Sequence, residues 1–229
     1  AESDNRAVYE NAAINFSRWF GYESWSLYQG DCLASARPLL WGFQVAPGLP
    51  TTINFASLTP HSTFDLASPA KEPPVGFYVL GGSFFGDWNW GPNSLLKAVL
   101  ATPRYGLAAF WLRSGVWRFE TLALGETLGE AFLRSVNDPT QVRSARTTFL
   151  LGDPTLRASI VAPARQLKAS GEAGGAVRLS WQPSADSGSK YFVYREWTQD
   201  GAPRFDILTA EPIGANAFTD LQPPQGLKT

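Results

Sequence analysis

The stretch Val75-Gly76-Phe77-Tyr78-Val79-Leu80 decides the fold class of this chain. It is a continuous apolar run of strand length, and it is bounded by Pro73-Pro74 before it and Gly81-Gly82 after it. A strand without polar alternation is typical of a parallel sheet that is covered on both faces. The run therefore predicts a central strand of an α/β domain.

The segments after this strand alternate between helical and strand patterns. Asn93 is a suitable N-cap for a helix over residues 94–100, and residues 106–112 form a second apolar strand pattern. A longer helical pattern covers residues 122–136, and residues 148–151 form a third short strand pattern. This order predicts an open parallel sheet with right-handed crossovers.

After residue 160 the pattern changes to short alternating segments between turn residues. Strands are expected over residues 176–181, 190–195 and 205–208, spaced as in a small β-sandwich. Such a sandwich needs about 100 residues, more than this stretch provides. We therefore expect two domains, residues 1–160 and 161–229, the second of them truncated at its C-terminal end.

Composition excludes several classes of protein. The formal net charge is −1, with 44% hydrophobic and 17% charged residues, which is typical of a globular chain without a basic surface for nucleic acid. The single cysteine excludes an internal disulfide and a multi-cysteine zinc site. No apolar run is long enough to cross a bilayer. Because methionine is absent, we expect the chain to be part of a processed product that begins downstream of any signal peptide.

Catalytic candidates are few. Ser83 follows the central strand, where sites of open α/β sheets lie, but Phe85 occupies the place of the second glycine of a nucleophile elbow. A serine nucleophile needs a neighbouring base, and His61 is the only histidine. Cys32 is the other candidate nucleophile, although a lone cysteine is more often a small buried hydrophobe. A hydrolase that uses Ser83 or Cys32 with His61 is one hypothesis.

A binding surface is the other hypothesis for the same region. Carboxylates at Asp87, Glu126 and Asp153 suit local roles in turns and in a helix, so we expect neither a metal site nor a cofactor. Aromatic residues are abundant after the central strand, and a sugar or peptide ligand is an alternative to a protein partner. The candidate binding residues are Phe84, Phe85, Asp87, Trp88 and Trp90.

Several motifs together resemble those of gingipain-type cysteine peptidases and their bacterial relatives. The motifs are residues 77–88, 93–98, 105–107, 123–129 and, as the most specific piece, Leu-Leu-Gly-Asp-Pro-Thr-Leu-Arg at residues 150–157. The resemblance covers residues 75–157 well and residues 1–74 faintly. It implies a caspase-like α/β domain whose N-terminal strands are missing, followed by a partial fibronectin type III or immunoglobulin-like module.

The resemblance also implies that the peptidase chemistry is lost. The position of the catalytic cysteine falls at Ser83, and the stretch that carries the catalytic histidine corresponds to residues 40–46, which contain none. We therefore expect a pseudo-peptidase: a non-catalytic, extracytoplasmic module that acts in adhesion, in scaffolding or as an accessory subunit. Its expected partners are other protein subunits or cell-surface components, and residues outside this chain or a neighbouring subunit would complete both folds.

Overall fold

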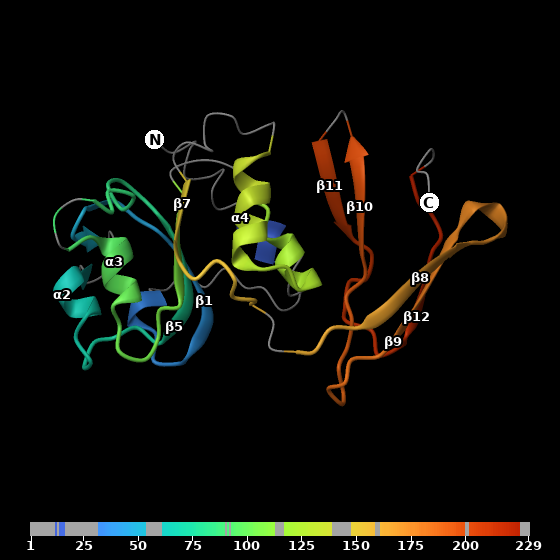
Figure 1. Ribbon diagram of the computed structural model, residues 1–229, viewed down its shortest axis with the longest axis horizontal. Helices are drawn as coiled ribbons and strands as arrows, with labels where there is room; N and C mark the ends of the chain where they lie inside the picture. Colours follow the sequence, from blue (N-terminus) through green and yellow to red (C-terminus); the bar gives the residue numbers. More distant parts are fainter. Residues whose placement is uncertain are drawn as a thin grey trace.

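The computed structural model describes residues 12, 14–16, 32–53, 61–89, 91, 93–112, 117–138, 148–158, 161–199 and 202–224. An α/β unit comes first and an antiparallel β unit follows it (Figure 1). The main sheet has the order β1-β5-β6-β7. Its strands are β1 (Leu39–Val45), β5 (Val75–Gly81), β6 (Ala108–Leu112) and β7 (Thr148–Gly152).

Strand β5 confirms the prediction made from its apolar run. It lies between β1 and β6 and runs parallel to both, with Phe77 aligned to Trp41 on one side and to Ala108 on the other. Every residue of β5 except Gly76 is buried. Because both faces of this strand are covered, neither set of alternating side chains faces water, which explains why the sequence is apolar throughout.

The prediction of an all-parallel sheet is wrong at its last strand. Strand β7 runs antiparallel to β6, with Phe110 opposite Leu150. A short apolar run such as residues 148–151 has the same pattern in either direction, so the sequence contains no signal for the orientation of this strand. The sheet is therefore mixed, with three parallel strands and an antiparallel edge.

Two helix boundaries also differ from expectation. Helix α3 (Leu95–Leu100) is preceded by Ser94 as its N-cap instead of Asn93, and the Ser94 hydroxyl donates to the carbonyl of Trp88 at 3.5 Å. The helix expected over residues 122–136 is divided into η3 (Glu120–Leu124) and α4 (Leu128–Val136). Gly125, in the left-handed region at φ 85°, ends the first piece, and a Thr127–Glu130 capping box begins the second.

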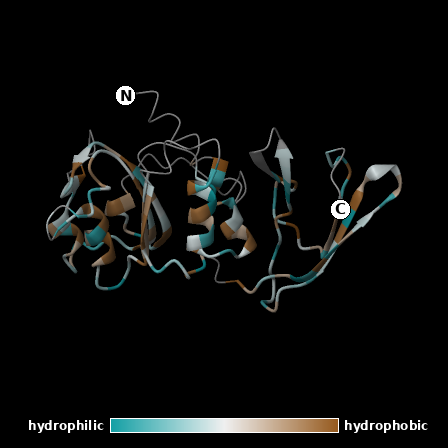
Figure 2. Ribbon diagram, turned by 45° about the horizontal axis from the view of Figure 1, so that its top comes forward, coloured by the Kyte–Doolittle hydropathy of each residue, from teal (hydrophilic) through white to brown (hydrophobic). Residues whose placement is uncertain are grey.

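Two hydrophobic clusters cover the two faces of the main sheet. The first contains Tyr78 and Leu80 of β5 and packs under α2 (Thr63–Leu66), α3 and η2 (Cys32–Ala34). The second contains Phe77 and Val79 and packs under η3 and α4. Figure 1 shows α2 and α3 on one side of the sheet and α4 on the other, and the helices carry hydrophobic residues (brown in Figure 2). The first unit is therefore a three-layer α/β/α arrangement.

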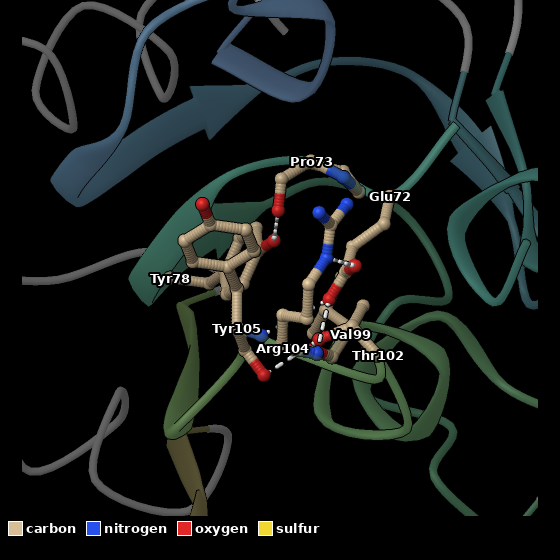
Figure 3. A network of polar contacts seen from close by, with 7 residues as sticks. All are labelled: Glu72, Pro73, Tyr78, Val99, Thr102, Arg104 and Tyr105. Atoms are coloured by element: carbon tan, nitrogen blue, oxygen red, sulfur yellow. Dashed lines mark hydrogen bonds and ion pairs between the residues drawn. The ribbon is translucent and has the colours of Figure 1, made fainter. Parts of the chain in front are cut away.

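A buried carboxylate joins the segments that precede β5 and β6 (Figure 3). The Glu72 side chain is fully buried and accepts hydrogen bonds from the backbone N–H of Arg104 at 2.6 Å and of Tyr105 at 3.0 Å. It also pairs with Nε of Arg104 at 2.9 Å. Burial acts to raise the pKa of Glu72, but these bonds outweigh burial and lower the pKa below its usual value. The amino ends of the two central strands are thus held together.

The second unit consists of two small antiparallel sheets. One has the order β12-β9-β8 and the other is the β10-β11 hairpin. The strands are β8 (Arg165–Gly171), β9 (Val177–Gln182), β10 (Tyr194–Gln199), β11 (Ala202–Ile207) and β12 (Ala217–Asp220). The strand expected over residues 176–181 is confirmed as β9. Strand β10 begins four residues later than expected, and β8 and β12 were not predicted.

A short third antiparallel sheet belongs to the first unit. It has the order β2-β3-β4, with β2 (Gly48–Leu49), β3 (Thr52–Ile53) and β4 (His61–Ser62), and it follows β1 in the chain. Within the described part of the chain, no helix is both long enough and apolar enough to span a membrane.

Candidate functional site

The carboxyl ends of the parallel strands meet at one edge of the main sheet, where sites of open α/β proteins form. After β1, the backbone N–H of Ala46 donates to Gly81 at the end of β5, at 3.0 Å. From β6, the indole Nε1 of Trp111 donates to the carbonyl of Gly82, also at 3.0 Å. Three strand ends are therefore joined within the first residues after β5.

Aromatic side chains fill this edge. The side chain of Phe85 has no exposed surface, and its ring lies against Gly82 and Gly48, where a Cβ atom on either glycine would collide with it. Trp111 lies against Gly86, so that a Cβ atom there would be 2.5 Å from its ring. These glycines make room for the two rings. Phe85 and Trp111 therefore pack closely against the chain at the strand ends.

The turn after β5 then directs two other aromatic residues outward. The turn is closed by hydrogen bonds from Asp87 N to Phe84 O at 3.1 Å and from Trp88 N to Gly86 O at 2.8 Å. The side chains of Phe84 and Trp88 are 53% and 47% exposed. Large aromatic side chains normally stabilise a fold because they are buried, whereas about half of each of these two side chains remains exposed.

Phe84 also has a strained backbone. Its φ angle is 66°, in the left-handed region, where a residue with a Cβ atom costs about 1–2 kcal/mol. Burial of the side chain does not offset this cost, because more than half of the ring is exposed. Strained backbone positions cluster at functional sites, and an observed outlier is a reason to look for a function.

A third exposed apolar residue lies at the same end of the sheet. Leu49 of β2 is 54% exposed and follows Gly48, which touches the ring of Phe85. The next residue, Pro50, accepts a hydrogen bond from the backbone N–H of Leu95 at the start of α3. We call Leu49, Phe84 and Trp88 the apolar rim. Leu49 was missed in the sequence analysis, since a single leucine in a proline-rich loop carries no signal of exposure.

Two polar side chains of the loop, those of Ser83 and Asp87, have no hydrogen-bond partner among the described residues. Ser83 is exposed and Asp87 is half-buried. Phe85, a candidate binding residue, lies in the core, and Trp90 is outside the described residues. The loop thus presents a hydroxyl and a carboxylate beside two aromatic rings.

The candidate catalytic residues lie in different places. Cys32 is buried beneath the middle of β1, with its Sγ 3.1 Å from the point where a Cβ atom on Gly42 would stand. His61 is half-buried in β4 and pairs with Ile53. Ser83 forms no hydrogen bond with either residue. The structure therefore shows no hydrogen bond between the serine hydroxyl and the histidine.

Of the carboxylates outside the loop, Asp153 has the turn role expected of it, whereas Glu126 lies between η3 and α4 and not within a helix. Asp153 accepts from the backbone N–H and hydroxyl of Thr155 at 2.8 and 2.7 Å, which closes a turn and lowers the pKa of Asp153. Glu126 forms a two-pronged ion pair with Arg134 of α4. Among the described residues, no three side chains of the metal-ligating types come together.

Comparison with known proteins adds no relative. No family model, curated protein or solved structure matches this chain.

Proposed function

We propose that this chain is a non-catalytic interaction module that binds a protein partner on the outer side of the cytoplasmic membrane, in adhesion, in scaffolding or as an accessory subunit. The observation that carries the proposal is that buried and exposed aromatic residues lie beside each other at the strand ends. Phe85 and Trp111 are buried at the strand ends, while Phe84 and Trp88 stay exposed beside them. This is the arrangement of a contact surface, in which exposed aromatic residues supply most of the affinity.

The strain at Phe84 supports this proposal. A mutation to glycine would remove the strain, so the residue has a cost of about 1–2 kcal/mol that folding alone does not justify. Burial of the exposed half of the side chain by a partner would contribute roughly 1–1.5 kcal/mol and would offset much of that cost. Neighbouring Asp87 and Ser83 would supply directional hydrogen bonds at the rim of the interface.

The resemblance to gingipain-type peptidases fits the same proposal. We assign the first unit to a caspase-like domain and the second to a partial fibronectin type III or immunoglobulin-like module, with a boundary near residue 160. The three-layer arrangement and the two antiparallel sheets support this assignment. Residues 40–46, the counterpart of the histidine-bearing stretch, lie in and just after β1, next to β5 in the sheet. On this proposal, the chain is an exported, catalytically inactive relative of such peptidases.

The proposal is tested by binding to intact envelopes of the cells that produce the protein. The double variant Phe84→Ser/Trp88→Ser is expected to bind at least about tenfold more weakly than the wild-type protein, because two interface aromatics are lost. Leu133→Ser is the matched control, since Leu133 is 55% exposed on α4, outside the apolar rim. Equal binding by the double variant and the wild-type protein would refute the role of the rim.

The alternative is a hydrolase that uses Ser83 or Cys32 with His61, and the exposed hydroxyl of Ser83 after β5 is the observation in its favour. It is tested by intact-mass measurement after treatment with a fluorophosphonate and with iodoacetamide, together with turnover of a peptide library. The interaction proposal expects no labelling of Ser83 and no turnover. Stoichiometric labelling that Ser83→Ala and His61→Ala both abolish would establish the hydrolase instead.

A further inference from the structure

Strand β8 is exposed along its whole length. All seven residues from Arg165 to Gly171 are exposed, and Leu167 reaches 68%. The strand pairs with β9 on one side only, and among the described residues β8 has no further hydrogen bond or ion pair. Its outer edge therefore presents a row of backbone N–H and C=O groups without partners, which is a template for another strand. In Figure 1, β8 lies at the border of the second unit, away from the β10-β11 hairpin.

The two faces of this sheet have different chemistry. Side chains of paired residues share a face, so Ala169 lies beside Leu179 and Ser170 beside Arg178. On β9, the residues that share a face with Leu179 are half-buried. The sheet is connected to the β10-β11 hairpin by an ion pair between Arg195 of β10 and Asp220 of β12, at 2.7 Å. The residues of β8 that lie on the same face are exposed to solvent. An apolar strip thus runs along the free edge on the inner side of the sheet.

The outer face of β8 is positively charged. Lys168 projects on the same face as Ser180 and Arg178, and Arg165 shares the face of Gln182. The strand contains no acidic residue. Lysine on an edge strand discourages pairing with a like-charged strand, because like charges directly opposite each other destabilise a sheet. Two copies of β8 would place two such basic strands side by side, which makes a second copy of this chain an unfavourable partner.

From this edge we infer that β8 accepts an extended acidic segment of a partner protein, which adds a strand to the β12-β9-β8 sheet. Backbone hydrogen bonds to the free edge hold the segment, as in other cases of strand addition. Its carboxylates lie on the outer face beside Lys168, and its apolar side chains extend the inner strip beside Leu167 and Ala169. The inference concerns a second surface and is independent of the apolar rim.

An irregularity limits where the segment pairs. The β8-β9 register shifts between Arg165 and Lys168, and Gln166 has φ 52°. A bulge of this kind twists the strand and interrupts regular pairing. The regular part of the edge is therefore Lys168–Gly171, so we expect the new contacts within these four residues.

The test is an NMR titration of the full chain with two soluble hexapeptides. One alternates glutamate and valine, and the other alternates lysine and valine. We expect the acidic peptide to shift the backbone amides of Lys168–Gly171 and to bind roughly fivefold more tightly than the basic peptide. In Lys168→Glu this preference is lost or reversed. In Lys190→Glu, which makes the same change of charge at an exposed site outside β8, it is retained.

Three results would overturn the inference. The first is the absence of any shift in β8 with the acidic peptide at millimolar concentration. The second is an equal effect of Lys168→Glu and Lys190→Glu, which would reveal attraction to the net charge alone. The third is dimerisation of the wild-type chain through β8 in analytical ultracentrifugation, which would make a second copy the occupant. Unchanged spectra of the remaining amides show that Lys168→Glu is folded.

Discussion

At the scale of single residues, two adjacent phenylalanines have opposite roles. Phe85 is fully buried against glycines at the strand ends, whereas Phe84 is 53% exposed and strained. Both are candidate binding residues from the sequence, because side-chain direction in a turn depends on backbone angles that a run such as Ser-Phe-Phe-Gly does not specify. The room for Phe85 comes from Gly48, a residue far away in the sequence.

Replacement of Phe84 separates stability from binding. We expect Phe84→Gly to lower the free energy of unfolding by less than about 1 kcal/mol, because relief of the strain offsets the loss of the buried half of the side chain. Phe85→Ala is the contrasting variant and should lower it by about 3–5 kcal/mol. Urea unfolding followed by tryptophan fluorescence measures both values. Destabilisation by Phe84→Gly as large as that by Phe85→Ala would show that the ring is packed and would remove the argument from strain.

At the scale of elements, the sequence predicts what depends on local pattern. The apolar run of β5, the alternation of β9 and the existence of α3 are all local, and they are confirmed. The direction of β7 depends on how the chain returns to the sheet, and β8 has no apolar pattern because nothing covers it. The candidate loop could be located from its position after β5, but the closure of the strand ends by Phe85 and Trp111 could not, since it requires contacts between strands.

The Glu72 cluster gives a prediction for the link between β5 and β6. Because the pKa of Glu72 is lower in the folded chain than its ordinary value of 4.5, its carboxylate stabilises the fold at pH values above 4.5. That contribution is lost as the pH falls through the lowered pKa. We expect Glu72→Gln to cost roughly 1–3 kcal/mol at pH 7 and to have a smaller effect at pH 3.

Chemical denaturation at both pH values measures this difference. Glu130→Gln is a control with an exposed carboxylate, whose pKa is also lowered, by hydrogen bonds from Thr127. It should cost much less at pH 7, because its surroundings are solvated. An equal cost for Glu72→Gln at the two pH values would contradict the assigned role of the Glu72 carboxylate.

At the scale of the whole molecule, the two units differ in the size of their cores. The first unit buries large side chains on both faces of its sheet, such as Tyr78, Phe110 and Trp117. In the described part of the second unit, the buried residues are small: Ala176, Val193 and Thr209. Two layers of two and three strands enclose little apolar volume, and they rely on links such as Arg195 with Asp206 and Asp220.

Amide hydrogen exchange should show this difference directly. We expect the amides of β9 and β12 to exchange at least about a hundredfold faster than those of β5 and β6, because strands with few buried apolar contacts open at lower free energy. Addition of the acidic hexapeptide should slow exchange in β8 and β9 without effect on β5. Equal protection in the two units would show that the second unit is as stable as the first.

The central claim is that the strand ends form a contact surface in place of a catalytic centre. The most direct measurement is site-specific photo-crosslinking on intact cell envelopes, with p-benzoylphenylalanine in place of Phe84 in one sample and of Leu133 in another. The account predicts one discrete protein adduct from position 84 and none from position 133. Adducts of equal yield from both positions, or none from position 84, would contradict it.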